Sequence, residues 1–590
     1  MIDFHETAEP LESSKLERYQ QISKGISGLR LAFIVFLCFQ FYLLFQDYSA
    51  HILWLISGIL GFLTLVKIHQ RIDRKIQLQK AICSVHHAEI NFVYEGRYPN
   101  DSGSVYNEPG HPYSGDIDLF GARSLFHYLN RTQTAYGSDR LASYLAEIST
   151  TDEARLRQNA VKELRKLREW QVLFRAKALL SKSTKEQAQT LLHWAELPST
   201  ELPKTINFLR WFLPSLMGLL LLGTFLLPET IPNSLPSLVF ILNLFMLGTQ
   251  FKKMQSAMNQ VDKIHPVIAR YSELIQWVEE TTFESEKLQS LQRELHAHQQ
   301  AASTHIRTLS RLIASMDSLN NAVGAFLFNG LFLYHLHQFQ KLNKWKQQHG
   351  ILLPKYLRIL GEFEALVSIA NFSNLHDDFT FPEWTETGSP QILGMGHPLI
   401  QKEKRVVNDL DFNQTPLIIL TGSNMSGKST FLRSIGINMV LASAGAPLCA
   451  KSAKLQTLPV LASMRGEDSL INNESYFFAE VKRLQSIIEK LKQQHSLVLL
   501  DEILRGTNSE DKRNGTKEVI RRLVELKAIG IIATHDLEVC SMTSEYPELV
   551  FAKHFEVEIE QDILHFDYVL RDGVCRNKSA SFLLKKMGVI

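Results

Sequence analysis

The feature that most constrains the fold of this chain is the stretch TGSNMSGKST, residues 421–430. Its fixed positions match the pattern G-x-x-x-x-G-K-[ST] and are Gly422, Gly427, Lys428 and Ser429. The residues before the stretch are apolar and typical of a buried strand, and those from Ser429 to Ser443 are typical of a helix. A glycine-flanked turn between a buried strand and a helix predicts an α/β unit.

Such a turn binds phosphate, because its backbone N–H groups and the positive end of the following helix point at the phosphate oxygens. The lysine supplies a cation, and the serine hydroxyl supplies a Mg²⁺ ligand. We therefore expect ATP and Mg²⁺ as cofactors. The loop residues expected to contact ATP are Gly422, Ser423, Asn424, Met425, Ser426, Gly427, Lys428, Ser429 and Thr430.

Two later segments carry matching chemistry. The run SLVLLDE reads as an apolar strand that ends in Asp501 and Glu502, and GIIATH reads as a strand that delivers His535. Because the carboxyl ends of parallel strands meet at one sheet edge, these side chains should lie near the loop. Asp501 is expected to hold Mg²⁺ with Ser429, Glu502 to activate water, and His535 to sense the γ-phosphate. Lys428, Glu502 and His535 are thus the expected catalytic residues of an ATPase.

Four apolar runs form two pairs in the first half of the chain, at residues 31–45 and 51–66 and at residues 208–227 and 235–251. Each pair is joined by a short loop without Lys or Arg, whereas basic residues flank both pairs. With flanking residues the runs reach the length that a bilayer requires. The positive-inside rule then predicts two membrane hairpins with the soluble portions in the cytoplasm. The competing interpretation is four buried core helices.

Composition adds few constraints. Lys and Arg number 63 against 61 Asp and Glu, a formal charge of +2, so any nucleic-acid surface must be a local patch. The five cysteines are far apart and no His cluster has zinc-ligand spacing, which indicates neither disulfides nor a metal–thiolate site. The apolar run at residues 322–336 is short and contains Asn329 and His335, so a buried helix is expected there.

Together the motifs TGSNMSGKSTFLRS, LLDEILRGTNSED and ATHDLE resemble the ATPase domain of the MutS mismatch-repair family, within the ABC class. The segment RGEDSLINNESYFFAEVKRL resembles the family's signature, which implies a homodimer in which Ser475 reaches the nucleotide of the opposite subunit. Val406 and Asn408 resemble positions that flank adenine. Residues 568–588 resemble the closing strand and helix that contact the partner.

The resemblance extends upstream to residue 116 and is interrupted by the second hairpin. It implies an α plus α/β fold, in which a helical MutS-like core and lever with two inserted transmembrane hairpins precedes an ABC-type P-loop ATPase domain. The expected boundaries are a tail at 1–27, hairpin 1 at 28–68, a linker at 69–115, the first part of the core at 116–205, hairpin 2 at 206–251, the lever and second part of the core at 252–375, and the ATPase domain at 376–590.

The resemblance implies an ATP-dependent DNA-binding dimer, and the two hairpins predict that it is anchored at the cytoplasmic membrane of a bacterium. Residues 69–115 are too few for the family's mismatch-reading and connector domains, and Phe4-His5-Glu6 is no counterpart of its mismatch-reading wedge. DNA binding without mismatch specificity is therefore expected. The alternative is an ATP-driven membrane transporter or conformational scaffold with no nucleic-acid role.

Overall fold

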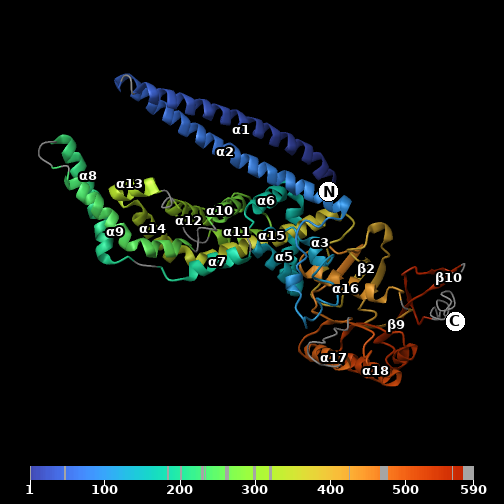
Figure 1. Cartoon of the computed structure of the whole chain (residues 1–590). Coiled ribbons are helices and arrows are strands. Elements are labelled where there is room, and N and C mark those ends of the chain that lie inside the picture. The colour runs from blue at the N-terminus through green and yellow to red at the C-terminus, as the bar shows by residue number, and fades with distance from the viewer. Residues whose placement is uncertain are drawn as a thin grey trace.

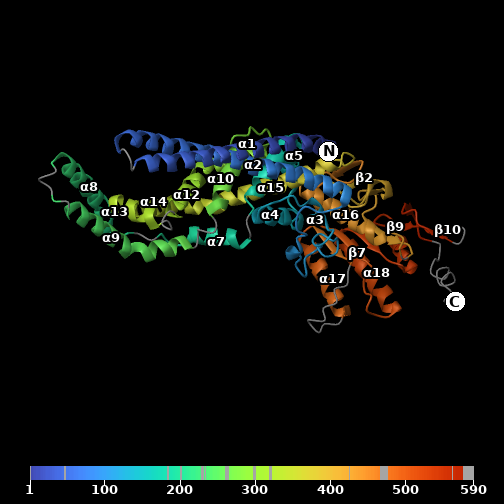
Figure 2. The same cartoon turned by 45° about the horizontal axis from the view of Figure 1, so that its top comes forward.

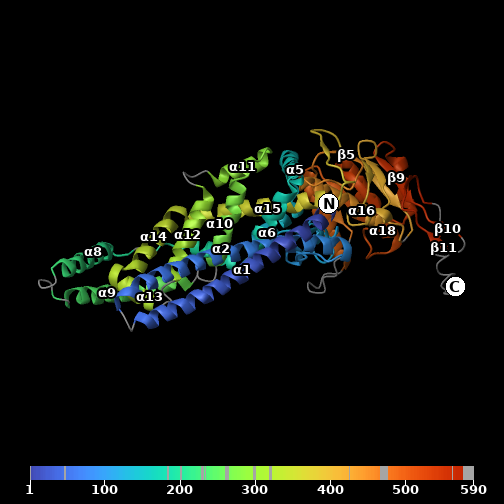
Figure 3. The same cartoon turned by 90° about the horizontal axis from the view of Figure 1, so that it is seen from above.

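The structure is a computed structural model, in which an α/β domain lies at one end of an elongated helical body (Figure 1). One helical hairpin lies at the other end of the body, and a longer hairpin runs from beside the α/β domain toward that end (Figure 1). Views from two further directions agree that both hairpin tips lie far from the α/β domain (Figures 2 and 3). The described residues are 2–44, 48–182, 185–199, 202–227, 232, 234–259, 265–296, 301–317, 322–423, 425–464, 476–560 and 563–575.

The first hairpin consists of α1 (Ile2–Leu44) and α2 (Tyr48–Glu95), and it is longer than the sequence indicated. The expectation of a tail at 1–27 and of a linker throughout 69–115 is wrong, because helix runs from residue 2 and continues to residue 95. Polar contacts between the two helices hold these extensions together, among them Ser23 Oγ with His69 Nε2 at 3.2 Å and Gln79 Nε2 with the Glu12 carbonyl at 3.0 Å.

The base of this hairpin is fixed to the helical body by a buried ion cluster. Glu89 of α2 accepts hydrogen bonds from Arg131 Nε at 2.6 Å and from Arg175 Nη2 at 2.5 Å. The three side chains are almost fully buried. Burial by itself raises the pKa of Glu89, but the two guanidinium groups outweigh it and hold that pKa well below its usual range.

The helical body packs around α15 (Leu353–Leu375), whose side chains are almost all buried. The sequence sets the local starts of its helices: Thr150 caps α5 by accepting a hydrogen bond from the Glu153 N–H, with acidic residues in the first turn and basic residues in the last. The other helices of the body are α3 (Leu125–Leu129), α4 (Ala135–Ala146), α5 (Thr151–Lys166), α6 (Arg168–Leu180), α7 (Lys185–Glu196), α10 (His265–Glu279), α11 (Glu286–Leu295), α12 (Ala302–Asp317) and α14 (Tyr334–His349).

The second hairpin consists of α8 (Lys204–Leu226) and α9 (Ser234–Asn259), and α13 (Ala322–Phe332) packs against both. The expectation that residues 322–336 form a buried helix is wrong for α13. Asn329 is buried, but Val323, Phe326, Leu327, Phe328 and Phe332 are exposed. Asn243 of α9 donates to the Gly330 carbonyl at 2.7 Å, so α13 joins the apolar surface of hairpin 2 and does not enter the core.

Among the described residues, α1, α2, α8 and α9 are long and apolar enough to cross a membrane. Their apolar stretches are almost entirely exposed in the folded chain. The competing interpretation, in which these segments are buried core helices, is therefore wrong.

The α/β domain is built on a six-stranded sheet of order β12-β9-β4-β8-β7-β6, in which only β12 is antiparallel to its neighbour. The strands β4, β7 and β8 are buried along their whole length, which explains their continuous apolar sequences and confirms the strands predicted there. The strands are β4 (Leu417–Thr421), β6 (Val460–Ser463), β7 (Leu497–Asp501), β8 (Ile529–Ala533), β9 (Val550–Phe555) and β12 (Leu570–Asp572).

A smaller sheet has the order β1-β5-β2-β3, and its strands β2 and β3 line one side of the site. Its strands are β1 (Glu383–Trp384), β2 (Gln391–Met395), β3 (Asn408–Asp411) and β5 (Ser452–Leu455), and a separate pair is formed by β10 (Glu558–Glu560) and β11 (Ile563–His565). The helices of the domain are α16 (Lys428–Ser443), α17 (Tyr476–Gln493), α18 (Ser509–Glu525) and α19 (Met542–Glu545). The described part is thus an α plus α/β chain.

Candidate nucleotide site

The glycine-flanked turn lies between β4 and α16, as the sequence predicts. Gly427 has a φ of 98°, and a Cβ there would lie 2.9 Å from Cδ1 of Tyr568. A Cβ on Gly422 would lie 2.6 Å from the Ser426 Oγ. Both glycines are therefore required, one for the left-handed backbone and one for the close approach. Asn424 lies outside the described residues, and Met425 has a φ of 69° and an exposed side chain.

Lys428 folds back over the loop. Its Nζ donates to the carbonyl oxygens of Gly422 at 2.8 Å and Ser423 at 2.9 Å. Burial lowers the pKa of Lys428, an effect that the nearby carboxylates of Glu502 and Asp501 oppose. The loop thus holds a buried cation at the carboxyl end of the central strand.

Ser429 and Asp501 meet at the start of α16. The Ser429 hydroxyl donates to Oδ2 of Asp501, and Oδ1 of Asp501 is buried without a hydrogen-bond partner among the described residues. Burial raises the pKa of Asp501, although the serine hydrogen bond and the charges of Arg505 and Lys428 lower it. A hydroxyl and an unsatisfied carboxylate oxygen fit the oxygen ligands that Mg²⁺ requires.

Glu502 and His535 form a second pair beside the first. The two side chains meet with His535 Nε2 at 2.8 Å from Glu502 Oε1, and Glu502 adopts a φ of 50°, which is rare for a side chain of this size. Burial acts to raise the pKa of Glu502, but the hydrogen bond and charge of His535 and the charge of Arg505 outweigh it and leave that pKa below its usual range. Glu502 is therefore held ionised and accepts a hydrogen bond from His535.

The strand order explains why these five side chains converge. β8 lies between β4 and β7, and Asp501 pairs in register with Ala533, two residues before His535. The structure therefore brings Lys428, Ser429, Asp501, Glu502 and His535 to one sheet edge.

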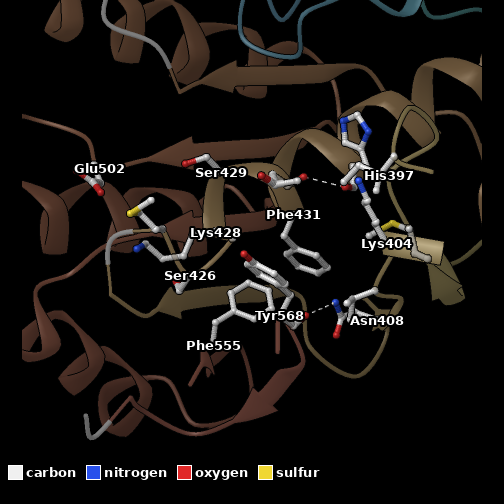
Figure 4. Close-up of a pocket in the computed structure, with 18 residues that line it drawn as sticks. His397, Lys404, Asn408, Ser426, Lys428, Ser429, Phe431, Glu502, Phe555 and Tyr568 are labelled. Atoms are coloured by element: carbon white, nitrogen blue, oxygen red, sulfur yellow. Dashed lines mark hydrogen bonds between the residues drawn. The ribbon is translucent and has the colours of Figure 1, made fainter. Parts of the chain in front are cut away.

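A pocket of about 430 Å³ continues from the loop toward the smaller sheet. Figure 4 shows Phe431, Phe555 and Tyr568 near its middle, between Lys428 and Ser429 at one end and His397 and Lys404 at the other. Ser426, Thr430 and Val406 also line it. Phe431 and Phe555 meet edge to face, with ring centroids 5.7 Å apart, and their rings provide the apolar surface that a base needs.

Asn408 lies in this pocket but fixes the backbone of its wall. Its Nδ2 donates to the Tyr568 carbonyl at 3.0 Å, and its Oδ1 accepts from the Leu570 N–H at 2.7 Å (Figure 4). Asn408 thus holds Tyr568, with its φ of 55°, against the loop.

Sequence reasoning assigned no role to the pocket residues His397, Phe431 and Phe555. The proline after His397 and the short β-like runs around it marked a loop near the site, but a single Phe has no spacing signal. Burial lowers the pKa of His397 to about 4, so the ring is neutral at pH 7.

The signature segment is described only in part, and Ser475 lies outside the described residues. Glu480 of α17 accepts hydrogen bonds from the Leu504 N–H at 2.7 Å and the Arg505 N–H at 2.9 Å. The start of α17 is thus attached to the turn that follows Asp501 and Glu502.

A junction connects this region to the helical body. Asp116 accepts from Arg483 of α17 at 3.1 Å and from the Met464 N–H at 2.7 Å, and its carbonyl accepts from Arg433 of α16 at 3.2 Å. At the other end of α16, Ser443 Oγ accepts from the Ser149 N–H at 2.7 Å. Both ends of the loop helix therefore contact the body.

The comparisons with known proteins match this half of the chain. The family model of MutS domain V matches residues 418–587. Human MutS protein homolog 4 is 30% identical over 243 residues, which are 39% of this chain and 25% of that protein. DNA mismatch repair protein MutS of Rickettsia africae (strain ESF-5) is 32% identical over 237 residues, which are 38% of this chain and 26% of that protein.

DNA mismatch repair protein MutS of Thermotoga petrophila (strain ATCC BAA-488 / DSM 13995 / JCM 10881 / RKU-1) is 29% identical over 247 residues, which are 41% of this chain and 31% of that protein. The chain therefore spans between 25% and 31% of the length of these relatives. These matches confirm the resemblance on which the sequence prediction rested. Residues 418–587 match MutS domain V, so this part of the chain is similar to proteins of the MutS family.

Proposed function

We propose that residues 376–590 bind and hydrolyse ATP with Mg²⁺. The observation that carries this proposal is the buried, unpartnered Oδ1 of Asp501 beside the Ser429 hydroxyl, at the mouth of a phosphate-binding loop. Ser429 and Asp501 would hold the metal, which neutralises charge on the β and γ phosphates when bound. The aromatic pocket with Val406 would hold the base.

The remaining residues have roles that follow from their positions. Lys428 leaves its two loop carbonyls and neutralises phosphate charge. Glu502 polarises the attacking water, since its pKa lies below the usual range and it stays ionised. His535 positions Glu502 through their shared hydrogen bond and meets the γ-phosphate.

We propose further that the chain acts as a homodimer in which Ser475 completes the site of the partner subunit. Exposed apolar side chains next to the site support this arrangement: Met425 on the loop and Phe477, Phe478 and Val481 at the start of α17. A second copy would remove this surface from water, as expected for an oligomer interface.

The two hairpins support anchoring in a membrane. Their exposed residues include Leu53, Trp54, Leu219 and Phe225, at 75%, 61%, 71% and 83% exposure, which in water would be strongly unfavourable. Both tips and α13 lie at the end far from the α/β domain (Figures 1 and 3). With basic residues flanking the hairpins, the ATPase domain would face the cytoplasm beneath the cytoplasmic membrane of a bacterium.

The client that best fits this assembly is DNA, bound without mismatch specificity. Two of the relatives are named DNA mismatch repair proteins. Both ends of α16 contact the helical body, so a change of conformation at the nucleotide site would be passed on to that body. The alternative is a transporter or scaffold. Asn243, the main polar residue in the spans, is buried against the Gly330 carbonyl, which favours a structural role over a substrate path.

ATP hydrolysis by the detergent-purified full chain with no DNA, matched duplex, mismatched duplex and branched DNA tests this proposal. Stimulation by any duplex or branched DNA without mismatch preference, with an affinity that falls steeply with salt, supports the DNA role. A rate of hydrolysis that none of these DNAs changes supports the transporter or scaffold. A monomer at all concentrations, with or without ATP, would refute the dimer.

A further inference from the structure

A second pocket lies far from the nucleotide, between the first hairpin and the lever. It has a volume of about 380 Å³ and is formed by α2, α10 and α12. Its charged lining consists of Arg74 from α2, Arg270 and Glu273 from α10, and Arg307 and Arg311 from α12. Arg270 also donates a hydrogen bond to Gln77 of α2, so the hairpin and the lever are in direct contact here.

The pocket carries an excess of positive charge. Glu273 is its one carboxylate in the described lining, and it pairs with Arg270 at 3.2 Å. Arg307 donates to the amide oxygen of Gln276. Arg74 and Arg311 are exposed, and in the part of the chain that the structure describes neither has a carboxylate within ion-pair distance. Four guanidinium groups from three helices, with one counter-charge, are suited to an anion with several oxygens.

The position of the pocket along the helices identifies the source of the anion. Arg74 follows Val66, where the apolar run at residues 51–66 ends, by eight positions, or roughly 12 Å of helix. Arg311 precedes the end of α12 at Asp317 by about 9 Å, and α13 with its exposed apolar face comes next. The headgroup layer of a bilayer is roughly 5–8 Å deep on each side. Two independent helices therefore place the pocket at the outer edge of that layer, where long arginine side chains can reach the headgroups.

We propose that this pocket binds the phosphate of an anionic lipid headgroup. The inference rests on the proposed membrane anchoring and adds a specific lipid to it. A lipid headgroup is the anion that this position favours, because it carries its phosphate at the membrane surface. Bound there, the lipid would join hairpin 1 to the lever, since Arg74 and Arg311 belong to different parts of the chain.

The test uses the full chain in nanodiscs of zwitterionic lipid, to which phosphatidylglycerol is added in increasing amounts. Native mass spectrometry measures how many molecules of the anionic lipid stay bound, and the double variant Arg74→Gln/Arg311→Gln is compared with wild type. The matched control is Lys341→Gln/Lys344→Gln, which removes the same charge from exposed positions of α14 at a similar helical distance from α13. Soluble glycerol phosphate and a short duplex DNA are added as competitors.

The expected result is a roughly 30-fold weaker retention of phosphatidylglycerol in the arginine variant, since each basic residue at a membrane surface contributes about 1 kcal/mol and 1.4 kcal/mol is tenfold. The control should lose less than about threefold. Equal losses in both variants would overturn the proposal, because the effect would then be general surface charge.

The competitors separate the sources of phosphate. Displacement of the lipid by glycerol phosphate at millimolar concentration would overturn the lipid assignment in favour of a soluble phosphate, and displacement by duplex DNA would reassign the pocket to nucleic acid. Failure of the wild-type chain to enter zwitterionic nanodiscs would instead refute the membrane anchoring itself. The two failures are therefore distinguishable.

Discussion

Replacing Glu89 with Gln should detach the base of hairpin 1 from the helical body. Glu89 Oε1 accepts from Arg131 at 2.6 Å and from Arg175 at 2.5 Å, and its Oε2 accepts from Arg131 Nη2 at 3.2 Å. Two unit charges whose centres lie about 4 Å apart interact by about 4 kcal/mol at an effective dielectric constant of 20. The neutral amide also brings an N–H₂ group against a guanidinium donor. Leaving two buried cations without their anion therefore costs about 3–5 kcal/mol.

The assay is amide hydrogen exchange of the full chain in detergent, read on peptides from residues 80–95. A loss of 3 kcal/mol in local opening free energy accelerates exchange there about 150-fold, while α16 keeps its wild-type protection. The control Glu95→Gln removes an exposed carboxylate paired with Arg97 at 2.9 Å, and should change exchange less than about fivefold.

The sign of the pH dependence follows from the depressed pKa of Glu89. The stabilisation is complete above the carboxyl range of the unfolded chain and is lost as the pH falls through the lower folded-state pKa. The difference in local opening free energy between wild type and variant should thus be largest at pH 7 and should shrink in strong acid. Unchanged exchange in Glu89→Gln at pH 7 would refute the claim that this cluster anchors the hairpin.

Three further predictions concern the nucleotide pocket and the membrane. Asn408→Ala removes both hydrogen bonds that hold the pocket wall at residues 568–570, so the Kd for ATP should rise about tenfold. Turnover at saturating ATP should change less than about threefold. A large fall in turnover at saturating ATP would contradict the supporting role of Asn408. Removal of Mg²⁺ with EDTA, or Asp501→Asn, should reduce hydrolysis at least about 100-fold while nucleotide still binds, measured by phosphate release and equilibrium binding; hydrolysis in EDTA would contradict the Asp501–Ser429 metal site. In a variant without native cysteines, brominated lipid tails should quench a fluorophore attached at Phe326→Cys of α13. They should not quench one attached at Val105→Cys, a position that is 83% exposed. Equal quenching at both positions would contradict the membrane contact of α13.

The sheet edge could be predicted because its residues follow a topological rule. Asp501 ends one continuous apolar run, His535 lies two residues after another, and the loop that carries Lys428 follows a third, so the carboxyl ends of these parallel strands bring the three side chains together. The same rule does not predict Phe431 or Phe555 as pocket residues, because an isolated aromatic residue in a strand or helix has no spacing that distinguishes it from a core residue. Tyr568 could be recognised only as part of a closing strand.

The errors in the helical half have a common physical cause. Residues 1–27 and 69–95 are polar, so alone they read as tail and linker, yet Glu89 finds its two cations at Arg131 and Arg175, which are remote in sequence. The helix α13 is too short to be assigned to membrane or core from composition, and its environment is set by Phe240 and Asn243 of α9. Both outcomes depend on contacts between distant segments.

The measurement that tests the central claim most directly compares ATP binding and turnover by the wild-type chain in lipid nanodiscs with those of Glu502→Gln. The amide cannot polarise the attacking water, but it leaves Lys428, Ser429 and Asp501 in place. We predict that Glu502→Gln binds ATP with a Kd within about threefold of wild type and hydrolyses it at least about 100-fold more slowly. The control Glu525→Gln, on the far end of α18, should behave as wild type. Wild-type turnover in Glu502→Gln, or no ATP binding by the wild-type chain, would contradict the account.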